Sequence, residues 1–284
     1  MNKLTRTIVD TCCYLVAFLF VQMFCTSVGM LLIPDFQVNG LALSLSLLAS
    51  SVITAAFYWW RNWWTEDVSD VKGISWTVYC VLLIVALSSF LPSLALLELM
   101  GVEPNEQQER LMMDIISSPF GFLIIAILVP LAEEIVFRGA ILRTLLDYFS
   151  KAKAEEGQLQ KVKVNVNVRQ KDGIWISIVI SAILFGFVHG NLAQFIHATL
   201  LGILFGWIYC NTKSIVPGIV LHFLNNGITF LLVTLNPEAN DASLMEMYDG
   251  NSLKMAIHVA FSVLLLFYSV WRLNTVFKKK HNKE

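Results

Sequence analysis

The sequence predicts an all-α, polytopic membrane protein with about eight transmembrane helices. Its 284 residues are 56% hydrophobic and only 14% charged, with a mean hydropathy of +0.66. Soluble domains carry about 25% charged residues, so this composition indicates the membrane class. A transmembrane helix needs about 20 apolar residues. Segments of this kind occur at 8–33, 41–60, 75–99, 119–142, 174–190, 194–210, 215–235 and 254–274.

The first apolar segment, 8–33, follows a short basic N-terminus, as a signal peptide would. It is longer than the apolar part of a signal peptide, and no small-residue cleavage site ends it. We therefore expect a retained transmembrane helix. Segments 41–60, 75–99 and 254–274 also lack charges in their central parts, and we assign all four to packing.

The expected helices divide the chain into three parts. Residues 1–118 hold helices 1–3, residues 119–235 hold a core of helices 4–7, and residues 236–284 hold the last helix and a basic tail. The core contains a polar insertion at 143–173. Its beginning is expected to extend the fourth helix along the membrane surface, and the alternating stretch KVKVNVNVR fits either a β-hairpin or a solvated linker.

The basic residues indicate an orientation. If the N-terminus is cytoplasmic, the opposite side holds only Arg110 and Lys254, and Arg138 lies inside a helix. The other Lys and Arg residues then fall in cytoplasmic connectors and tails, as the positive-inside rule describes. We therefore expect an integral protein of the plasma (inner) membrane with both termini in the cytoplasm.

Several common classes of site are not indicated. The net charge of −1 gives no sign of nucleic-acid binding, and the five cysteines lack CxxC spacing, so neither a disulfide framework nor a zinc cluster is expected. Pro92 and Pro130 predict kinks or freed carbonyls. Gly202 and Gly206 form GxxxG, a common pattern that favours close helix approach.

Polar side chains gather in three of the apolar segments. The fourth carries Glu133, Glu134 and Arg138, the fifth ends in FGFVHGN, and the seventh contains LHFLNNG. Ionisable groups are rare in a bilayer and mark functional sites by default. We therefore select the candidates Glu133, Glu134, Arg138, Phe185, His189, His222 and Asn226.

Helical spacing separates the two carboxylates. Glu134 and Arg138 are four residues apart and share a face, which favours an ion pair. Glu133 is rotated by about 100° from Glu134, so it is free to act as a general base. A structural ion pair, satisfied buried carboxylates and hydrogen bonds between helices are the alternatives for these groups. His197, in the sixth segment, is assigned to packing.

Three motifs in this region resemble a known family. EEIVFR fits EExxxR, FGFVH fits FxxxH and HFLNN fits HxxxN, in the order found in the CPBP intramembrane peptidases, which include CAAX-box proteases and bacteriocin self-immunity proteins. The resemblance covers about 119–235. It implies a glutamate-dependent endopeptidase that acts within the membrane on a peptide or membrane-protein substrate.

The resemblance also implies residue roles. Glu133 would activate water with help from His189, His222 and Asn226 would stabilise the oxyanion, and Glu134 with Arg138 would hold the geometry. No cofactor is expected. Zinc is the alternative because it accepts His and carboxylate ligands, although no HExxH motif is present.

If His189, His222 and Glu133 form one site, His189 must lie deeper in the membrane than its place at the end of the fifth segment suggests. This residue ends the short fifth segment, so the fifth and sixth helices must dip inward if His189 and His222 are both to approach Glu133. Two other functions stay open, a proton-coupled transporter and a non-catalytic membrane scaffold or immunity protein. Besides a substrate, membrane lipid is the expected partner, and the sequence leaves the substrate, the oligomeric state and the role of 143–173 open.

Overall fold

The computed structural model describes residues 1–33, 39–64, 73–102, 106–149, 166–236 and 242–281, and no strand occurs in this part of the chain. The all-α class is confirmed. The helices in chain order are α1 (Lys3–Leu32), α2 (Gly40–Trp60), α4 (Trp76–Leu99), α5 (Glu106–Ile116), η2 (Leu123–Leu128), α6 (Val129–Glu134), η3 (Ile135–Leu142), α8 (Val166–Phe187), α9 (Leu192–Thr212), α10 (Val216–Leu235), η5 (Glu246–Tyr248) and α11 (Ser252–His281).

Six helices in the described part are long and apolar enough to cross a membrane. These are α1, α2, α4, α9, α10 and α11, and each coincides with a predicted segment. Residues 174–187 of the predicted segment 174–190 lie in α8, and residues 121–142 of the predicted segment 119–142 are helical. Many large apolar side chains on these helices are exposed, as expected for surfaces that face lipid. The protein is an integral membrane protein.

The insertion 143–173 differs from one prediction. Helical backbone continues from η3 to Phe149, as expected for an extension of the fourth helix. Residues 166–169 belong to α8, so a β-strand there is wrong. The rest of the proposed hairpin, 161–165, lies outside the described residues. Residues 166–169 continue directly into the apolar part of α8, and this continuity favours a helix over the strand that the alternating valines predict.

The fourth predicted segment is one helical run with two π-helical parts. The π-helices η2 and η3 flank the short α-helix α6, which carries VPLAEE. Wide π turns often occur at functional sites. Pro130 lies at the beginning of α6 and lacks the N–H that a regular ladder needs. The candidate carboxylates therefore lie in a short α-helix between two π-helical stretches.

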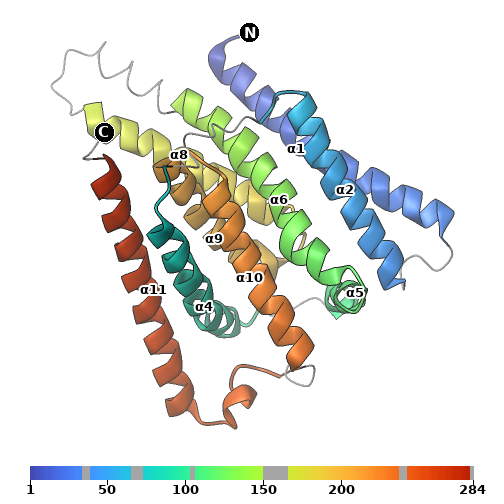
Figure 1. Cartoon of the computed structure of the whole chain (residues 1–284), viewed down its shortest axis with the longest axis vertical. Coiled ribbons are helices and arrows are strands. Elements are labelled where there is room, and N and C mark those ends of the chain that lie inside the picture. The colour runs from blue at the N-terminus through green and yellow to red at the C-terminus, as the bar shows by residue number, and fades with distance from the viewer. Residues whose placement is uncertain (34–38, 65–72, 103–105, 150–165, 237–241, 282–284) are drawn as a thin grey trace.

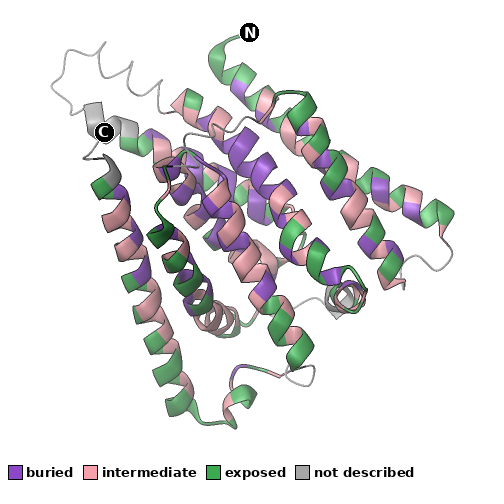
Figure 2. Ribbon diagram, viewed as in Figure 1, coloured by how far each residue is buried: buried purple, intermediate pink, exposed green. Residues whose placement is uncertain are grey.

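This irregular helix lies at the centre of the bundle. Every residue from Ala132 to Leu142 is buried, and Figure 2 shows the buried residues concentrated there, whereas α11 is largely exposed. Helix α1 packs on α2, α8 on α9 and α4 on α11 around it. Both termini lie at one end of the bundle (Figure 1).

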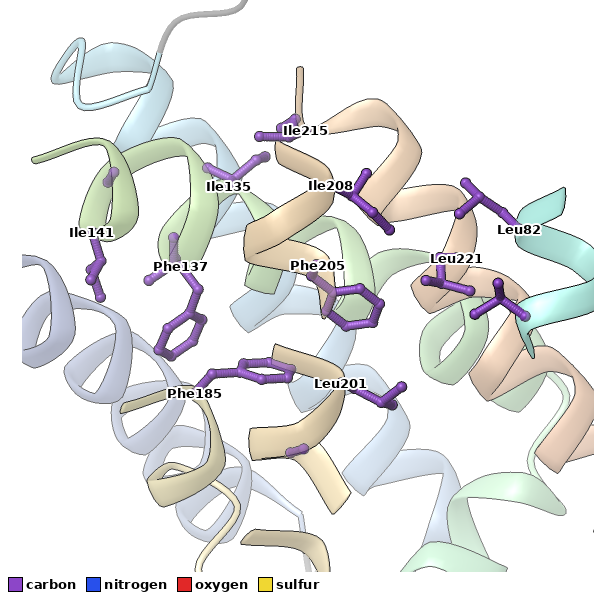
Figure 3. Packing of buried hydrophobic residues seen from close by; sticks show 14 of the residues in the cluster. Leu82, Ile135, Phe137, Ile141, Phe185, Leu201, Phe205, Ile208, Ile215 and Leu221 are labelled. Carbon is purple, nitrogen blue, oxygen red and sulfur yellow. The ribbon is translucent and has the colours of Figure 1, made fainter. Parts of the chain in front are cut away.

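Aromatic and aliphatic side chains fill the space between the central helix and its neighbours. Phe137 of η3 meets Phe185 of α8 edge-on at 5.1 Å between ring centroids. Phe205 of α9 and Leu221 of α10 continue this cluster (Figure 3). Gly202 and Gly206 let α9 approach α8, because a Cβ at either position would lie within about 3.1 Å of Ala182 or Ile178. The expected close approach at GxxxG is confirmed.

Candidate active site

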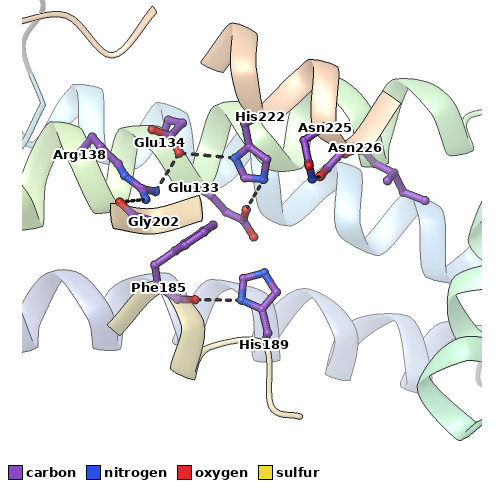
Figure 4. A network of polar contacts seen from close by, with 10 residues as sticks. Glu133, Glu134, Arg138, Phe185, His189, Gly202, His222, Asn225 and Asn226 are labelled. Atoms are coloured by element: carbon purple, nitrogen blue, oxygen red, sulfur yellow. Dashed lines mark hydrogen bonds and ion pairs between the residues drawn. The ribbon is translucent and has the colours of Figure 1, made fainter. Parts of the chain in front are cut away.

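The predicted site residues come from three elements that meet around one cavity. Glu133 and Glu134 end α6, His222 and Asn226 lie in α10, and His189 follows the end of α8 (Figure 4). The cavity has a volume of about 420 Å³. Its lining includes Glu133, Phe185, His189, His222 and Asn226, together with apolar side chains from α2, α5, η2 and α10.

The Glu134–Arg138 ion pair is present, as the spacing predicts. Arg138 Nη1 donates to Glu134 Oε1 at 2.8 Å, and both side chains are buried, at 1% and 0% exposure. The helix carrying Gly218 passes so close that an added Cβ would lie 2.7 Å from Glu134 Oε2. A glycine at 218 therefore makes room for this carboxylate.

Three other groups fix the Arg138 guanidinium. Its Nη2 donates to the backbone carbonyl of Gly202 at 3.2 Å. Its Cζ lies 4.5 Å from the ring centroid of Phe185 and 4.9 Å from that of Phe205. Cation–π contacts of this kind strengthen when the cation is desolvated. Arg138 thus ties α6, α8 and α9 together, which explains why Phe185 belongs to the site as a supporting residue.

The His222 ring lies between the two carboxylates. Its Nε2 is 3.6 Å from Glu133 Oε2, and its Nδ1 is 3.5 Å from Glu134 Oε1. Both separations exceed a normal hydrogen bond, so the ring lies between the carboxylates without a hydrogen bond to either of them. The ring stacks on Phe205 at 5.0 Å and meets Phe185 edge-on at 5.8 Å. The same two phenyl rings thus position Arg138 and His222.

The His189 ring faces the cavity from the side opposite to His222 (Figure 4). Its Nδ1 pairs with the backbone carbonyl of Phe185 at 2.9 Å. Because a carbonyl can only accept, Nδ1 must donate, and in the neutral ring Nε2 is then an acceptor. Helix α8 stops at Phe187, so His189 reaches the cavity from the turn into α9. His189 and His222 meet at one cavity with Glu133, as a shared site requires.

Asn226 is anchored by the irregular backbone of η2. Its Nδ2 donates to the carbonyl of Ile125 at 3.1 Å. In a π register that carbonyl would pair with residue 130, which is a proline without an N–H. The freed carbonyl expected at Pro130 is therefore bonded by Asn226. Asn225 Nδ2 donates to Asn226 Oδ1 at 3.3 Å, which orients the amide further.

Sequence reasoning missed several polar contributors to the cavity, among them Asn225 and His197. Asn225 lines it beside Asn226, and the doubled asparagine in HFLNN was the only signal. His197, assigned to packing, also lines the cavity, and its Nδ1 pairs with Ser93 Oγ of α4. The packing assignment of His197 is therefore incomplete. Nothing in the spacing of Ser93 and His197, which are 104 residues apart, indicated their contact.

The described part of the chain contains no arrangement of side chains suited to a metal ion. No group of three or more His, Cys, Asp or Glu residues has an arrangement that would hold a metal ion. All five cysteines are free thiols, as the sequence indicates. The absence of a cofactor stays a prediction that chelation can test.

Comparison with known proteins identifies the region that forms this cavity. Residues 115–228 match the sequence profile of the family described as Type II CAAX prenyl endopeptidase Rce1-like. This segment of the chain is similar to the Rce1-like family. The family recognised from the three motifs is therefore confirmed, and the Rce1-like segment contains every predicted site residue.

Two curated relatives extend this finding. The chain is 25% identical over 142 residues to "Putative membrane peptidase YdiL" of Bacillus subtilis (strain 168). It is 27% identical over 140 residues to "Membrane-embedded CAAX protease MroQ" of Staphylococcus aureus (strain USA300). Each alignment covers 49% of this chain, and 48% and 49% of the respective relative. The chain thus matches about half the length of each of these relatives. No solved structure gives a significant match.

Proposed function

We propose that the protein is a membrane-embedded endopeptidase that hydrolyses a peptide bond with water activated by Glu133. The observation that carries the proposal is the convergence of Glu133, His189 and His222 from three elements on one cavity. Peptide hydrolysis needs a base, an oxyanion stabiliser and a site for water. These residues supply suitable groups for the first two, and the cavity supplies the third.

In the proposed reaction Glu133 takes a proton from water while the water oxygen bonds to the scissile carbonyl carbon. The carbonyl oxygen then carries the negative charge of a tetrahedral intermediate. Glu133 returns the proton to the amide nitrogen as the carbon–nitrogen bond breaks, which gives a carboxylic acid and an amine. His189 assists as a second proton acceptor. Its Nδ1 donates to the Phe185 carbonyl, which leaves Nε2 of the neutral ring as the acceptor.

His222 and Asn226 are the proposed donors to the oxyanion. The 3.6 Å between His222 Nε2 and Glu133 Oε2 is too long for a hydrogen bond, so this nitrogen is available to a substrate oxygen in the cavity. Asn226 uses one amide hydrogen on the Ile125 carbonyl and keeps a second. Donors fixed before the reaction stabilise developing charge without reorganising.

The substrate class is a membrane-associated protein or peptide, and a lipidated one is the first to test. The lining divides into polar groups, which include the Glu133 carboxylate and the imidazoles, and apolar side chains such as Leu47, Ile116 and Val233. An apolar group beside the cut peptide bond would suit this division. One relative is named a CAAX protease, which makes a lipidated C-terminal peptide a natural first reporter.

We further propose a plasma-membrane location with both termini in the cytoplasm. The two termini lie at the same end of the bundle (Figure 1), which agrees with an even number of spans. The concentration of Lys and Arg at this end supports the cytoplasmic assignment.

The proposal is tested by cleavage in reconstituted vesicles. Paired reporter peptides with and without a C-terminal lipid are incubated with the full chain and with Glu133→Gln. The proposal expects new termini with the unchanged protein and none with the variant, by mass spectrometry. Cleavage of every reporter at equal rates by both proteins would contradict it.

A further inference from the structure

A second cavity lies at the end of the bundle that carries both termini, away from the candidate active site. Its volume is about 640 Å³, and it lies between the beginning of α4 and the end of α11, with Thr212 of α9 beside them. Its described lining residues include none of those around the Glu133 cavity. The proposed peptidase reaction therefore makes no use of it.

The cavity is electropositive. Arg272 and Lys279 line it from α11, and Val276 lies between them on the same helix. Residues seven apart are separated by two helical turns and share a face. No acidic side chain occurs among the described residues of the lining. Two cations on one wall favour an anionic occupant.

Its position corresponds to the membrane–water interface. The span in α4 begins at Trp76, and the span in α11 ends at Lys279. Trp76, the first residue of α4, is 77% exposed. Exposed tryptophans at helix ends are typical of the headgroup level of a bilayer. A phosphate in the cavity would thus lie at the depth where lipid phosphates already are.

The remaining lining is mixed in a way that suits a lipid. Ser75 and Thr77 offer hydroxyl groups near the cations, whereas Ile74, Val78 and Phe277 offer apolar surface. Helices α4 and α11 pack side by side from this cavity toward the other end of the bundle (Figure 1). A free inorganic anion would use only the polar part of such a cavity, whereas a phospholipid would use both parts.

We propose that this cavity binds an anionic phospholipid, with its headgroup phosphate between Arg272 and Lys279 and its acyl chains along α4 and α11. Basic pockets between transmembrane helices bind anionic headgroups by this combination of charge and apolar contact. The site tethers the last helix to α4 in a membrane that contains such lipids. It is independent of the proposed peptidase activity.

The experiment compares lipid binding by the full chain and two double variants in detergent. Arg272→Gln with Lys279→Gln removes both charges from the cavity. Lys254→Gln with Lys278→Gln is the matched control, because it removes the same charge from residues outside the lining. Phosphatidylglycerol, phosphatidylcholine and inorganic phosphate are titrated in turn, and bound lipid and the thermal midpoint are measured by native mass spectrometry and thermal unfolding.

The expected result is specific for one lipid and one pair of residues. Phosphatidylglycerol should bind the unchanged chain and the control variant, and binding to the cavity variant should be at least about tenfold weaker. Arg272→Lys with Lys279→Arg keeps both charges and should retain binding, which separates charge from folding. Equal binding of phosphatidylcholine, equal stabilisation by inorganic phosphate, or equal loss in the control variant would each overturn the proposal.

Discussion

His222 Nε2 lies 3.6 Å from Glu133 Oε2, while the other ring nitrogen faces the neighbouring carboxylate, Glu134. The imidazole therefore lies between Glu133, which it contacts itself, and Glu134, which is paired with Arg138. Adjacent residues on one helix acquire different surroundings in this way. The division of roles between the two glutamates follows from their surroundings and gives the predictions below.

Removing the Glu134 charge should destabilise the protein. Glu134→Gln leaves the Arg138 guanidinium buried without its carboxylate partner, which costs about 3–5 kcal/mol in comparable pairs. Thermal unfolding in detergent measures the loss. The double variant Glu134→Gln with Arg138→Met removes the whole pair and should recover part of the lost stability. A Glu134→Gln protein as stable as the unchanged chain would show that the pair is not structural.

A side chain at Gly186 should disturb the turn that carries His189. An added Cβ there would lie 2.1 Å from Thr199 Oγ1 and 2.7 Å from the backbone oxygen of Phe195. The backbone cannot yield locally, so α8 and α9 must separate. We expect Gly186→Ala to cost about 1–3 kcal/mol of stability and to reduce cleavage.

The matched control for this change is Gly227→Ala. Its added Cβ would find its nearest neighbour at 3.8 Å, an ordinary contact. Stability should therefore be retained in Gly227→Ala. If both alanine variants behave alike, close packing of α8 on α9 does not determine where His189 lies.

Replacing Asn226 should lower the rate of the chemical step more than substrate binding. Asn226→Ala removes a proposed oxyanion donor, and losses of about 10²–10³ in kcat are typical for such donors. Steady-state kinetics separate kcat from KM. Asn211→Ala is the control, since Asn211 Nδ2 bonds only its own helix at Trp207. A change confined to KM would assign Asn226 to substrate binding instead.

Cleavage should survive removal of divalent metals. The proposed reaction uses a carboxylate and imidazoles, and no metal ion takes part in it. Exhaustive dialysis against a chelator followed by the reporter assay checks this. Activity that disappears and returns only with added zinc would require a metal-dependent mechanism.

Contacts within one helix were predictable from the sequence, and contacts between helices were not. The spacing of Glu134 and Arg138 fixed their shared face because the helical repeat is constant. The position of His189 depends on where α8 stops and how deeply its turn lies, and no local pattern encodes that depth. The pairing of Asn226 with the Ile125 carbonyl depends on a π register beside Pro130. Three motifs in order nevertheless pointed to the family, because each motif places its polar side chain on a different helix.

The central claim is that Glu133 activates the water. Its most direct test compares cleavage rates of one reporter peptide by the unchanged chain, Glu133→Gln and the control Asp10→Asn, whose acid lies exposed on α1. The account predicts a loss of at least about 10²-fold for Glu133→Gln, no loss for Asp10→Asn and unchanged thermal unfolding for both. Cleavage by Glu133→Gln at the rate of the unchanged chain would contradict the account.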